Sequence, residues 1–230
     1  MKLTFLGRGA AFNFNSDNNC AYFIKGETLY LIDCGEKICD KILALGLLDV
    51  INKVIVLITH LHSDHIGSLE PFLYYIHFFT DKSIDIYYKD SMNLYDLLVL
   101  TGINFPFEVK SDFSAISDVK VECVVQEHIP GSYGFFIYDD ECSIFYSGDT
   151  KTINSRAVEE LKSGVIQEVY HEVTVSTNSM IHTHLSQLES AFPEKYRKNV
   201  ALMHFADDKT IEAARSSGFT IVEEVKVARK

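Results

Sequence analysis

The sequence predicts an α/β fold, an αββα sandwich in which two mixed β-sheets pack together and helices cover their outer faces. Three observations predict this class. Short runs rich in Val, Ile, Tyr and Phe recur along the chain, each bounded by Gly, Asp, Asn or Ser, as β-strands are. Segments with helical spacing separate several of these runs. Two tight turns, at residues 26–27 and 139–141, join neighbouring runs into hairpins, and hairpins combined with strand–helix units favour mixed sheets over a purely parallel one.

Each element is predicted by its composition and its boundaries. Ser186 and Glu189 fit a capping box at the start of the fifth helix, and Gly218 stands where the last helix should stop. Residues 71–79 carry apolar side chains on nearly every face, which predicts a buried core helix or a dimer contact. The predicted strands are 2–6, 21–25, 28–32, 53–58, 83–88, 120–125, 133–138, 142–146, 165–170, 199–203 and 220–227. The predicted helices are 37–47, 65–79, 91–100, 154–163, 186–192 and 208–217.

Length and composition set further expectations. With 230 residues, 47% of them hydrophobic, and no linker or low-complexity tract, we expect one domain over residues 1–230. No stretch of about 18 apolar residues runs without a charge, and the start of the chain has no signal-peptide pattern, so we expect a cytoplasmic protein without a membrane partner. The five cysteines lack redox or metal-binding spacing, which favours buried free thiols. The formal net charge of -11 argues against broad binding of nucleic acid, although metal ions can reverse the sign of an acidic pocket.

The stretch HLHSDH at positions 60–65 follows directly after a predicted strand. Side chains alternate in an extended segment, so His60 and His62 point the same way and can hold one metal ion together. Asp64 and His65 come where the chain turns into a helix and can face a second ion. Imidazole with carboxylate suits zinc first, with manganese and iron as alternatives. Strand ends converge on one edge of a sheet sandwich, so other residues just past predicted strands can meet this cluster there: His128, Asp149, His171 and His204.

The HLHSDH stretch matches the H-x-H-x-D-H signature of the metallo-β-lactamase superfamily, and the chain resembles that superfamily over nearly its whole length. The stretches LIDCG at 31–35, SGDT at 147–150 and LMHF at 202–205 match further motifs in the superfamily's order. The resemblance implies the metallo-β-lactamase fold and two zinc ions. By it, one ion would be held by His60, His62 and His128, the other by Asp64, His65 and His204, and Asp149 would bridge them.

The same resemblance implies a hydrolase. A hydroxide held between two such ions is a nucleophile at neutral pH, and the ions stabilise the charge that grows on the substrate's oxygens. A carboxylate has two oxygens and spans two cations with little strain, which agrees with Asp149 as the bridge. Asp64 would belong to the catalytic machinery as well as to the ligands. Asp33 would orient the histidine loop through hydrogen bonds, or would only form a turn before Gly35.

Three stretches resemble the ribonuclease Z-like branch of the superfamily: PGSYG at 130–134, YHEVT at 170–174 and THLS at 183–186. This resemblance implies a phosphodiesterase in which Glu172 orients His184, and His184 protonates the leaving oxygen. His182, two residues earlier, is a competing candidate for the acid. Ser132 and the amides of its turn would contact a phosphate oxygen, the alternative being a tight turn without that role. Arg8 stands where the branch usually has a small residue.

One departure from the branch narrows the substrate. The span from His128 to Asp149 is taken up by a turn and two predicted strands, which leaves no room for the long arm that grips tRNA in the full-length members. We therefore expect a phosphodiester substrate that is a small molecule or an RNA, with tRNA maturation in doubt. Hydrolysis of a lactone, thioester or β-lactam remains an alternative, as does a non-catalytic metal-binding protein. A homodimer is a further expectation from the family.

Overall fold

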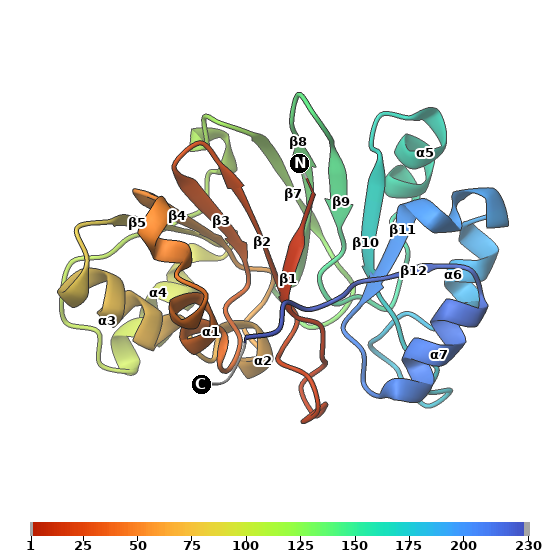
Figure 1. The fold of residues 1–230 in the computed structure, drawn as a ribbon, viewed down its shortest axis with the longest axis horizontal. Coiled ribbons are helices and arrows are strands. Elements are labelled where there is room, and N and C mark those ends of the chain that lie inside the picture. Colours follow the sequence, from red (N-terminus) through yellow and green to blue (C-terminus); the bar gives the residue numbers. More distant parts are fainter. Residues whose placement is uncertain (1, 228–230) are drawn as a thin grey trace.

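The computed structural model describes residues 2–227 and contains two six-stranded β-sheets packed face to face. Figure 1 shows the sheets in the middle, with α1, α3 and α4 on the outer side of one and α5, α6 and α7 on the outer side of the other. The predicted sandwich class is therefore confirmed. The first sheet contains β1 (Thr4–Gly7), β2 (Cys20–Lys25), β3 (Thr28–Ile32), β4 (Lys53–Leu57), β5 (Ser83–Tyr87) and β6 (Val109–Lys110). The second contains β7 (Lys120–Val125), β8 (Tyr133–Tyr138), β9 (Ile144–Tyr146), β10 (Glu168–Glu172), β11 (Val200–Met203) and β12 (Thr220–Ile221).

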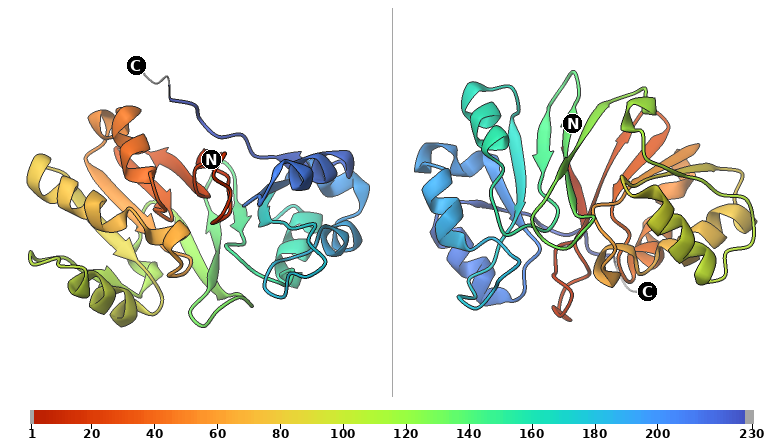
Figure 2. Two further views of the ribbon diagram at one scale, coloured as in Figure 1. Left: turned by 90° about the horizontal axis from the view of Figure 1, so that it is seen from below. Right: turned by 180° about the vertical axis from the view of Figure 1, so that it is seen from behind.

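Both sheets begin antiparallel and continue parallel. β1, β2 and β3 pair antiparallel, and β4, β5 and β6 then follow β3 in parallel. β7, β8 and β9 repeat the antiparallel start, and β10, β11 and β12 continue in parallel. The hairpin turns predicted at 26–27 and 139–141 join β2 to β3 and β8 to β9. The carboxyl ends of the parallel strands consequently collect at one edge of the sandwich, which Figure 2 shows from two further sides.

The helices are α1 (Ile38–Ala44), α2 (Ser63–Ile66), α3 (Leu69–Phe79), α4 (Ser91–Leu100), α5 (Ser155–Ser163), α6 (Leu185–Ala191) and α7 (Asp208–Ser216). Short 3₁₀ helices cover Leu47–Val50, Phe113–Ala115 and Glu194–Asn199. The single helix predicted at 65–79 is in fact two, because Ser68 interrupts it: its hydroxyl donates to the Gly35 carbonyl and accepts from the Cys39 amide (3.0 Å). α2 thus becomes a separate turn of helix that positions Asp64 and His65.

The sequence predicts the N-cap of α6 at Ser186, but it lies two residues earlier, at His184. The helix starts at Leu185, and His184 is its N-cap: the His184 ring accepts from the Ser186 amide (3.2 Å) while the Gln187 side chain accepts from the His184 amide (2.8 Å). The last helix ends at Ser216, one residue before the predicted end, and Gly218 follows the C-cap Ser217 in the left-handed region (φ +81°).

The aromatic segment at 71–79 is buried on one face only. Phe72 and Ile76 of α3 lie in the core, whereas Phe78 and Phe79 are 60% and 74% exposed. All five cysteines are free thiols. Three of them are buried as expected, whereas Cys123 and Cys142 are only partly buried. No helix within residues 2–227 has the length and apolar character needed to cross a membrane.

The two ends of the described chain connect the halves of the sandwich. After β12 the chain crosses back to the first sheet, where the Val225 amide donates to the Phe5 carbonyl of β1 (2.9 Å). Arg8 follows β1 and donates to the Val222 carbonyl (2.9 Å) and to the Glu223 carboxylate (2.8 Å). Arg8, which departs from the ribonuclease Z-like pattern, therefore connects the crossing segment to the N-terminal half. Figure 1 shows this segment in blue, running from β12 past β1.

Candidate metal centre

The seven predicted metal ligands come together at the edge where the parallel strands end. The segment after β4 and the turn α2 supply four of them, and the segments that follow β7, β9 and β11 supply one each. His204 has a left-handed backbone (φ 58°), a conformation that costs energy for a residue other than glycine and that recurs at functional sites. The ligands from these elements are His60, His62, Asp64, His65, His128, Asp149 and His204.

Among the described residues, five overlapping groups of three have ligand atoms within 4.8 Å of one another, and two of the five include His182. Two others consist of predicted ligands other than Asp149. In the first, His62 Nδ1 is 3.0 Å from His60 Nε2 and 3.2 Å from His128 Nε2. In the second, Asp64 Oδ2 is 3.3 Å from His65 Nε2 and 3.3 Å from the Nε2 of His204. The groups have the same membership as the two ligand sets that the superfamily resemblance implies.

Asp149 lies between the two groups. Its Oδ2 is 3.9 Å from His60 Nε2 and 3.8 Å from His128 Nε2, on the side of the first group. Its Oδ1 is 3.6 Å from His65 Nε2, and its Oδ2 is 3.3 Å from His204 Nε2, on the side of the second. Gly148 before it has φ +59°, and a Cβ there would lie 2.6 Å from the Tyr133 carbonyl oxygen, so the turn that delivers Asp149 requires glycine.

The arrangement of these donor atoms suits bound divalent cations better than direct hydrogen bonds between the side chains. His65 Nε2 and Asp149 Oδ1 are buried and have no hydrogen-bond partner, although buried polar atoms are normally paired. Burial, reinforced by the neighbouring His65, lowers the pKa of His60 well below its usual value, so this imidazole is held in the neutral form that binds metals. Burial alone would raise the pKa of Asp149, but the charges of His204 and His65 hold it well below its usual range. Imidazole and carboxylate in these numbers suit zinc, with manganese or iron as alternatives.

Asp33 is hydrogen-bonded to His65 and to the segment before the histidine loop. Its carboxylate accepts from His65 Nδ1 (2.8 Å), from the Thr59 amide (2.8 Å) and from the Thr59 hydroxyl (2.8 Å). The bond to Nδ1 leaves Nε2 of His65 facing Asp64 and Asp149, as an outer hydrogen bond to a metal-binding histidine does. Asp33 itself is fully buried and has φ 64°, so the fold maintains a costly conformation there.

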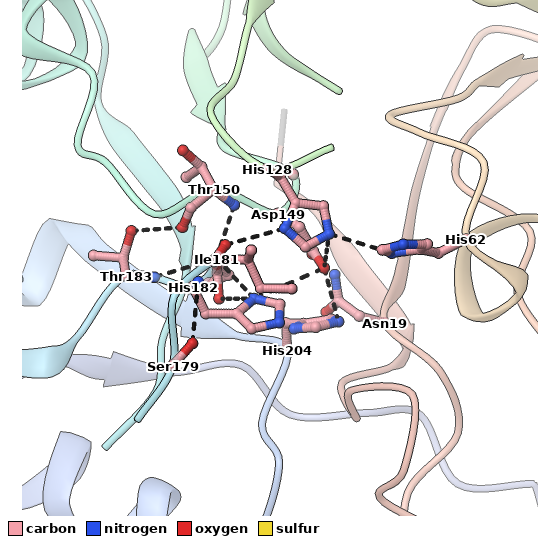
Figure 3. A network of polar contacts seen from close by, with 12 residues as sticks. Asn19, His62, His128, Asp149, Thr150, Ser179, Ile181, His182, Thr183 and His204 are labelled. Atoms are coloured by element: carbon pink, nitrogen blue, oxygen red, sulfur yellow. Dashed lines mark hydrogen bonds and ion pairs between the residues drawn. The ribbon is translucent and has the colours of Figure 1, made fainter. Parts of the chain in front are cut away.

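The contact predicted between Glu172 and His184 is not present. Glu172 is buried at the end of β10, and its carboxylate accepts from Nδ1 of His182 (3.0 Å). Figure 3 shows His182 beside Asp149 and His204. His184 points elsewhere, with Nδ1 next to the Ser186 hydroxyl (2.9 Å) and Nε2 next to the Val175 carbonyl (3.3 Å). The cap of α6 uses this ring, and the preceding loop brings His182 to the centre instead.

Glu172 is held by several donors. Its Oε1 accepts from the Thr150 amide (2.8 Å) and from the Thr183 amide (3.4 Å). Burial raises the pKa of Glu172, and the hydrogen bond from His182 opposes this. Burial would lower the pKa of His182, but Glu172 outweighs it and the pKa is raised. Glu172 and His182 therefore form a hydrogen-bonded carboxyl–imidazole pair beside the candidate metal ligands.

Ser132 does not reach the cavity. It is 2% exposed, and its hydroxyl accepts from the Ile129 amide (3.3 Å) within the turn between β7 and β8. The Tyr88 hydroxyl donates to the Gly131 carbonyl (2.8 Å) and fastens this turn to the end of β5. The geometry therefore favours a role for Ser132 in the tight turn beyond His128 over a contact with a phosphate oxygen.

A cavity of about 260 Å³ opens over the centre. Five of the seven candidate ligands and the Glu172–His182 pair form its floor, and the remaining residues form a wall that is mostly apolar. Three segments form that wall: the loop between β1 and β2, the loop between β10 and α6, and the segment that follows β11. Sequence reasoning singled out the stretch at 170–174 and His182, but predicted no apolar wall from these segments. The wall residues are Ala10, Ala11, Phe12, Asn13, Val173, Thr174, Ile181 and Ala206.

Comparison with known proteins assigns the family. The family model described as Anti-Pycsar protein Apyc1 matches residues 1–98 and 97–228. The chain belongs to the Apyc1 family. An Apyc1 protein of Paenibacillus sp. (strain J14) is 30% identical over 90% of each chain, and one of Bacillus phage 010DV004 is 29% identical, again over 90% of each. This family is a narrower assignment than the ribonuclease Z-like branch that the motifs suggest.

Solved structures confirm the metallo-β-lactamase fold. A diphosphatase from the PhnP family superposes with a TM-score of 0.75 at 19% identity, covering 99% of this chain and 97% of that one. The metallo-β-lactamase fold protein YhfI from Bacillus subtilis gives 0.72 at 16% identity, with the same coverage. The short form of human tRNase Z gives 0.70 at 20% identity and covers both chains completely. The Apyc1 family chain thus has the superfamily's architecture, with a cluster of buried His and Asp at the place that the fold provides.

Proposed function

We propose that this protein is a dinuclear metal-dependent phosphodiesterase that hydrolyses a cyclic nucleotide. The observation that carries the proposal is the pair of ligand groups sharing Asp149, with the Glu172–His182 pair beside them in one cavity. When bound, the metal ions would supply a nucleophile at neutral pH and positive charge for the phosphoryl oxygens. Zinc is the first expectation for both positions, with manganese or iron as alternatives.

The substrate class rests on the family and on the cavity. The name of the relatives, Anti-Pycsar protein, points to the degradation of a cyclic nucleotide. A cavity of about 260 Å³ is of the size that suits a small molecule. The formal net charge of -11 disfavours an extended RNA backbone, which a basic surface would have to hold. A cyclic mononucleotide satisfies all three conditions.

The chain's own residues would move the proton. Glu172 holds His182 through Nδ1, so the remaining ring nitrogen is free to serve the substrate. His182 would donate its proton to the ribose oxygen that leaves phosphorus, which opens the cyclic diester to a linear monophosphate. Glu172, fixed by the Thr150 amide, would keep the ring in position and stabilise its charged form.

A substrate panel with paired variants tests the proposal. The panel contains nucleoside 3′,5′-cyclic phosphates, bis(p-nitrophenyl) phosphate, a lactone and a thioester. We expect turnover of the cyclic nucleotides that a chelator abolishes and added metal restores. His182→Ala should lower kcat by about 10²-fold or more while the metal content stays unchanged. The matched variant His184→Asn, which keeps a good N-cap for α6, should retain activity.

Two outcomes would contradict the proposal. Metal-loaded protein that hydrolyses the lactone or the thioester but no phosphodiester would place the chain with another reaction of the superfamily. Activity that survives His182→Ala and disappears in His184→Asn would show that His184, and not His182, is the general acid.

A further inference from the structure

The wall of the cavity ends in two apolar side chains that face solvent. Phe12, in the loop between β1 and β2, is 85% exposed although it lines the cavity. Ile181, in the loop between β10 and α6, lines the same cavity and is 40% exposed. Exposed apolar side chains gathered at one cavity are a common mark of a binding site. Their place in the fold suggests what they bind.

Both loops are attached to the candidate metal centre. The Phe205 carbonyl, next to His204, accepts from the Ala10 amide (3.0 Å) and from the Asn13 side chain (2.9 Å), which fixes the backbone on either side of Phe12. The Ile181 carbonyl accepts from Nδ1 of His128 (3.0 Å), so the backbone that presents Ile181 also orients a candidate ligand (Figure 3). The apolar wall therefore has a set position relative to the charged floor.

The lining of the cavity has a charged part and a mostly apolar part. The floor offers carboxylates and imidazoles, which would hold metal ions and through them a phosphate. The polar side chains of the wall are already engaged within the protein: Asn13 donates to Phe205 and accepts from the Asn15 amide (3.2 Å), and the Thr174 hydroxyl accepts from the Ser176 amide (3.1 Å). What the wall offers a ligand is apolar contact and one aromatic ring.

A nucleotide has the matching division, since its phosphate is charged and its base is a flat ring with apolar faces. We propose that Phe12 stacks on the base of the bound nucleotide and that Ile181 packs against it, with the phosphate at the candidate metal centre. This inference rests on the proposed function and adds the residues that recognise the base. Phe12 is a binding residue in this scheme and takes no part in proton transfer.

The chain supplies a matched control. Phe14 lies in the same loop and is also 85% exposed, but it does not line the cavity. A role of the loop in folding or in a protein contact would make both phenylalanines matter, whereas base stacking requires only Phe12. The variants Phe12→Ala, Phe12→Tyr and Phe14→Ala separate these cases.

The substrates are a nucleoside 3′,5′-cyclic phosphate and the base-free methyl riboside 3′,5′-cyclic phosphate. Loss of one base–aromatic stack should raise KM for the nucleotide about tenfold in Phe12→Ala, with kcat nearly unchanged. The base-free compound should show no difference between Phe12→Ala and the unaltered protein. Phe12→Tyr should restore the KM, and Phe14→Ala should match the unaltered protein on both substrates.

The result that overturns the inference is an unchanged KM for the nucleotide in Phe12→Ala, or an equal loss on both substrates. A change of association state in Phe12→Ala and Phe14→Ala alike, measured by sedimentation, would assign the loop to a protein contact and overturn it too. Calorimetry with the nucleoside 5′-monophosphate separates this inference from the reaction. If no cyclic phosphate is hydrolysed but Phe12→Ala weakens this binding about tenfold, the base contact stands and the proposed reaction fails. If no cyclic phosphate is hydrolysed and the monophosphate does not bind, both fail.

Discussion

Replacing Glu172 by Gln tests how the chain prepares its proton donor. The carboxylate accepts from the Thr150 amide through Oε1 and from Nδ1 of His182 through Oε2 (3.0 Å). A glutamine can keep the first bond with its carbonyl oxygen, but its NH₂ group then faces Nδ1. Nδ1 of His182 then keeps only the carbonyl oxygen at the Oε1 position (3.1 Å) as an acceptor, and the negative charge that stabilises the protonated ring is lost. A hydrogen bond to a charged group is worth about 1.5–3 kcal/mol, and its loss in the transition state predicts a fall in kcat of about 10- to 150-fold.

The leaving group separates this effect from general damage. In a cyclic nucleotide the leaving group is a ribose oxygen, which would leave as an unstable alkoxide and therefore needs the proton. The p-nitrophenolate group leaves readily without one. We therefore expect Glu172→Gln to lose most of its kcat on the cyclic nucleotide and to lose little on bis(p-nitrophenyl) phosphate, with the metal content unchanged. Glu168→Gln, on the same strand but bonded to Tyr170, is the control and should leave both activities intact. Equal losses on both substrates would refute the assignment of Glu172 to the leaving-group proton.

Two further predictions concern the metal ligands and the core. Asp33→Ala leaves the Thr59 amide and His65 Nδ1 without their acceptor. Metal affinity, measured against a competing chelator, should fall about 10- to 100-fold, and the free energy of unfolding, measured with denaturant, should fall by about 1–3 kcal/mol. Unchanged metal affinity would contradict the role of Asp33. Burial lowers the pKa of His171 to about 4, and its Nε2 has no partner, so its neutral form favours the folded state. The stability that neutral His171 contributes is fully present above the pKa of histidine in the unfolded chain, and it is lost as pH falls toward the folded pKa of about 4. The loss between pH 8 and pH 5 should be about 2 kcal/mol. Urea unfolding at both pH values should show that difference shrink in His171→Leu, and an identical pH dependence in the two proteins would refute it.

The sequence predicts most of the fold because its strands have clear boundaries. Residues 28–32, 120–125 and 133–138 form strands with the predicted limits. β6 escapes prediction, since two residues carry no periodic signal and pair only because β5 offers an edge. β10 starts at Glu168 and not at residue 165, so His171 lies inside the strand and its side chain is buried in the core.

The candidate ligands were predictable for a physical reason. Each follows a strand, and parallel strands deliver their carboxyl ends to one edge, so spacing along the chain becomes proximity in space. The choice between His182 and His184 was not predictable in this way, because it depends on where α6 begins. The helix starts at Leu185, which uses His184 as its cap and leaves His182 to Glu172. Phe12 carried no signal at all, since an exposed aromatic in a loop acquires meaning only beside a cavity.

The central claim is that seven side chains hold two metal ions that the reaction requires. The most direct measurement is a zinc titration of metal-free protein, with the initial rate of cyclic nucleotide hydrolysis recorded at each addition. The account predicts no activity without metal, a rise with added zinc and a plateau at about two equivalents per chain, with Asp149→Asn failing to reach it. A plateau at one equivalent, or full activity in metal-free protein, would contradict the account.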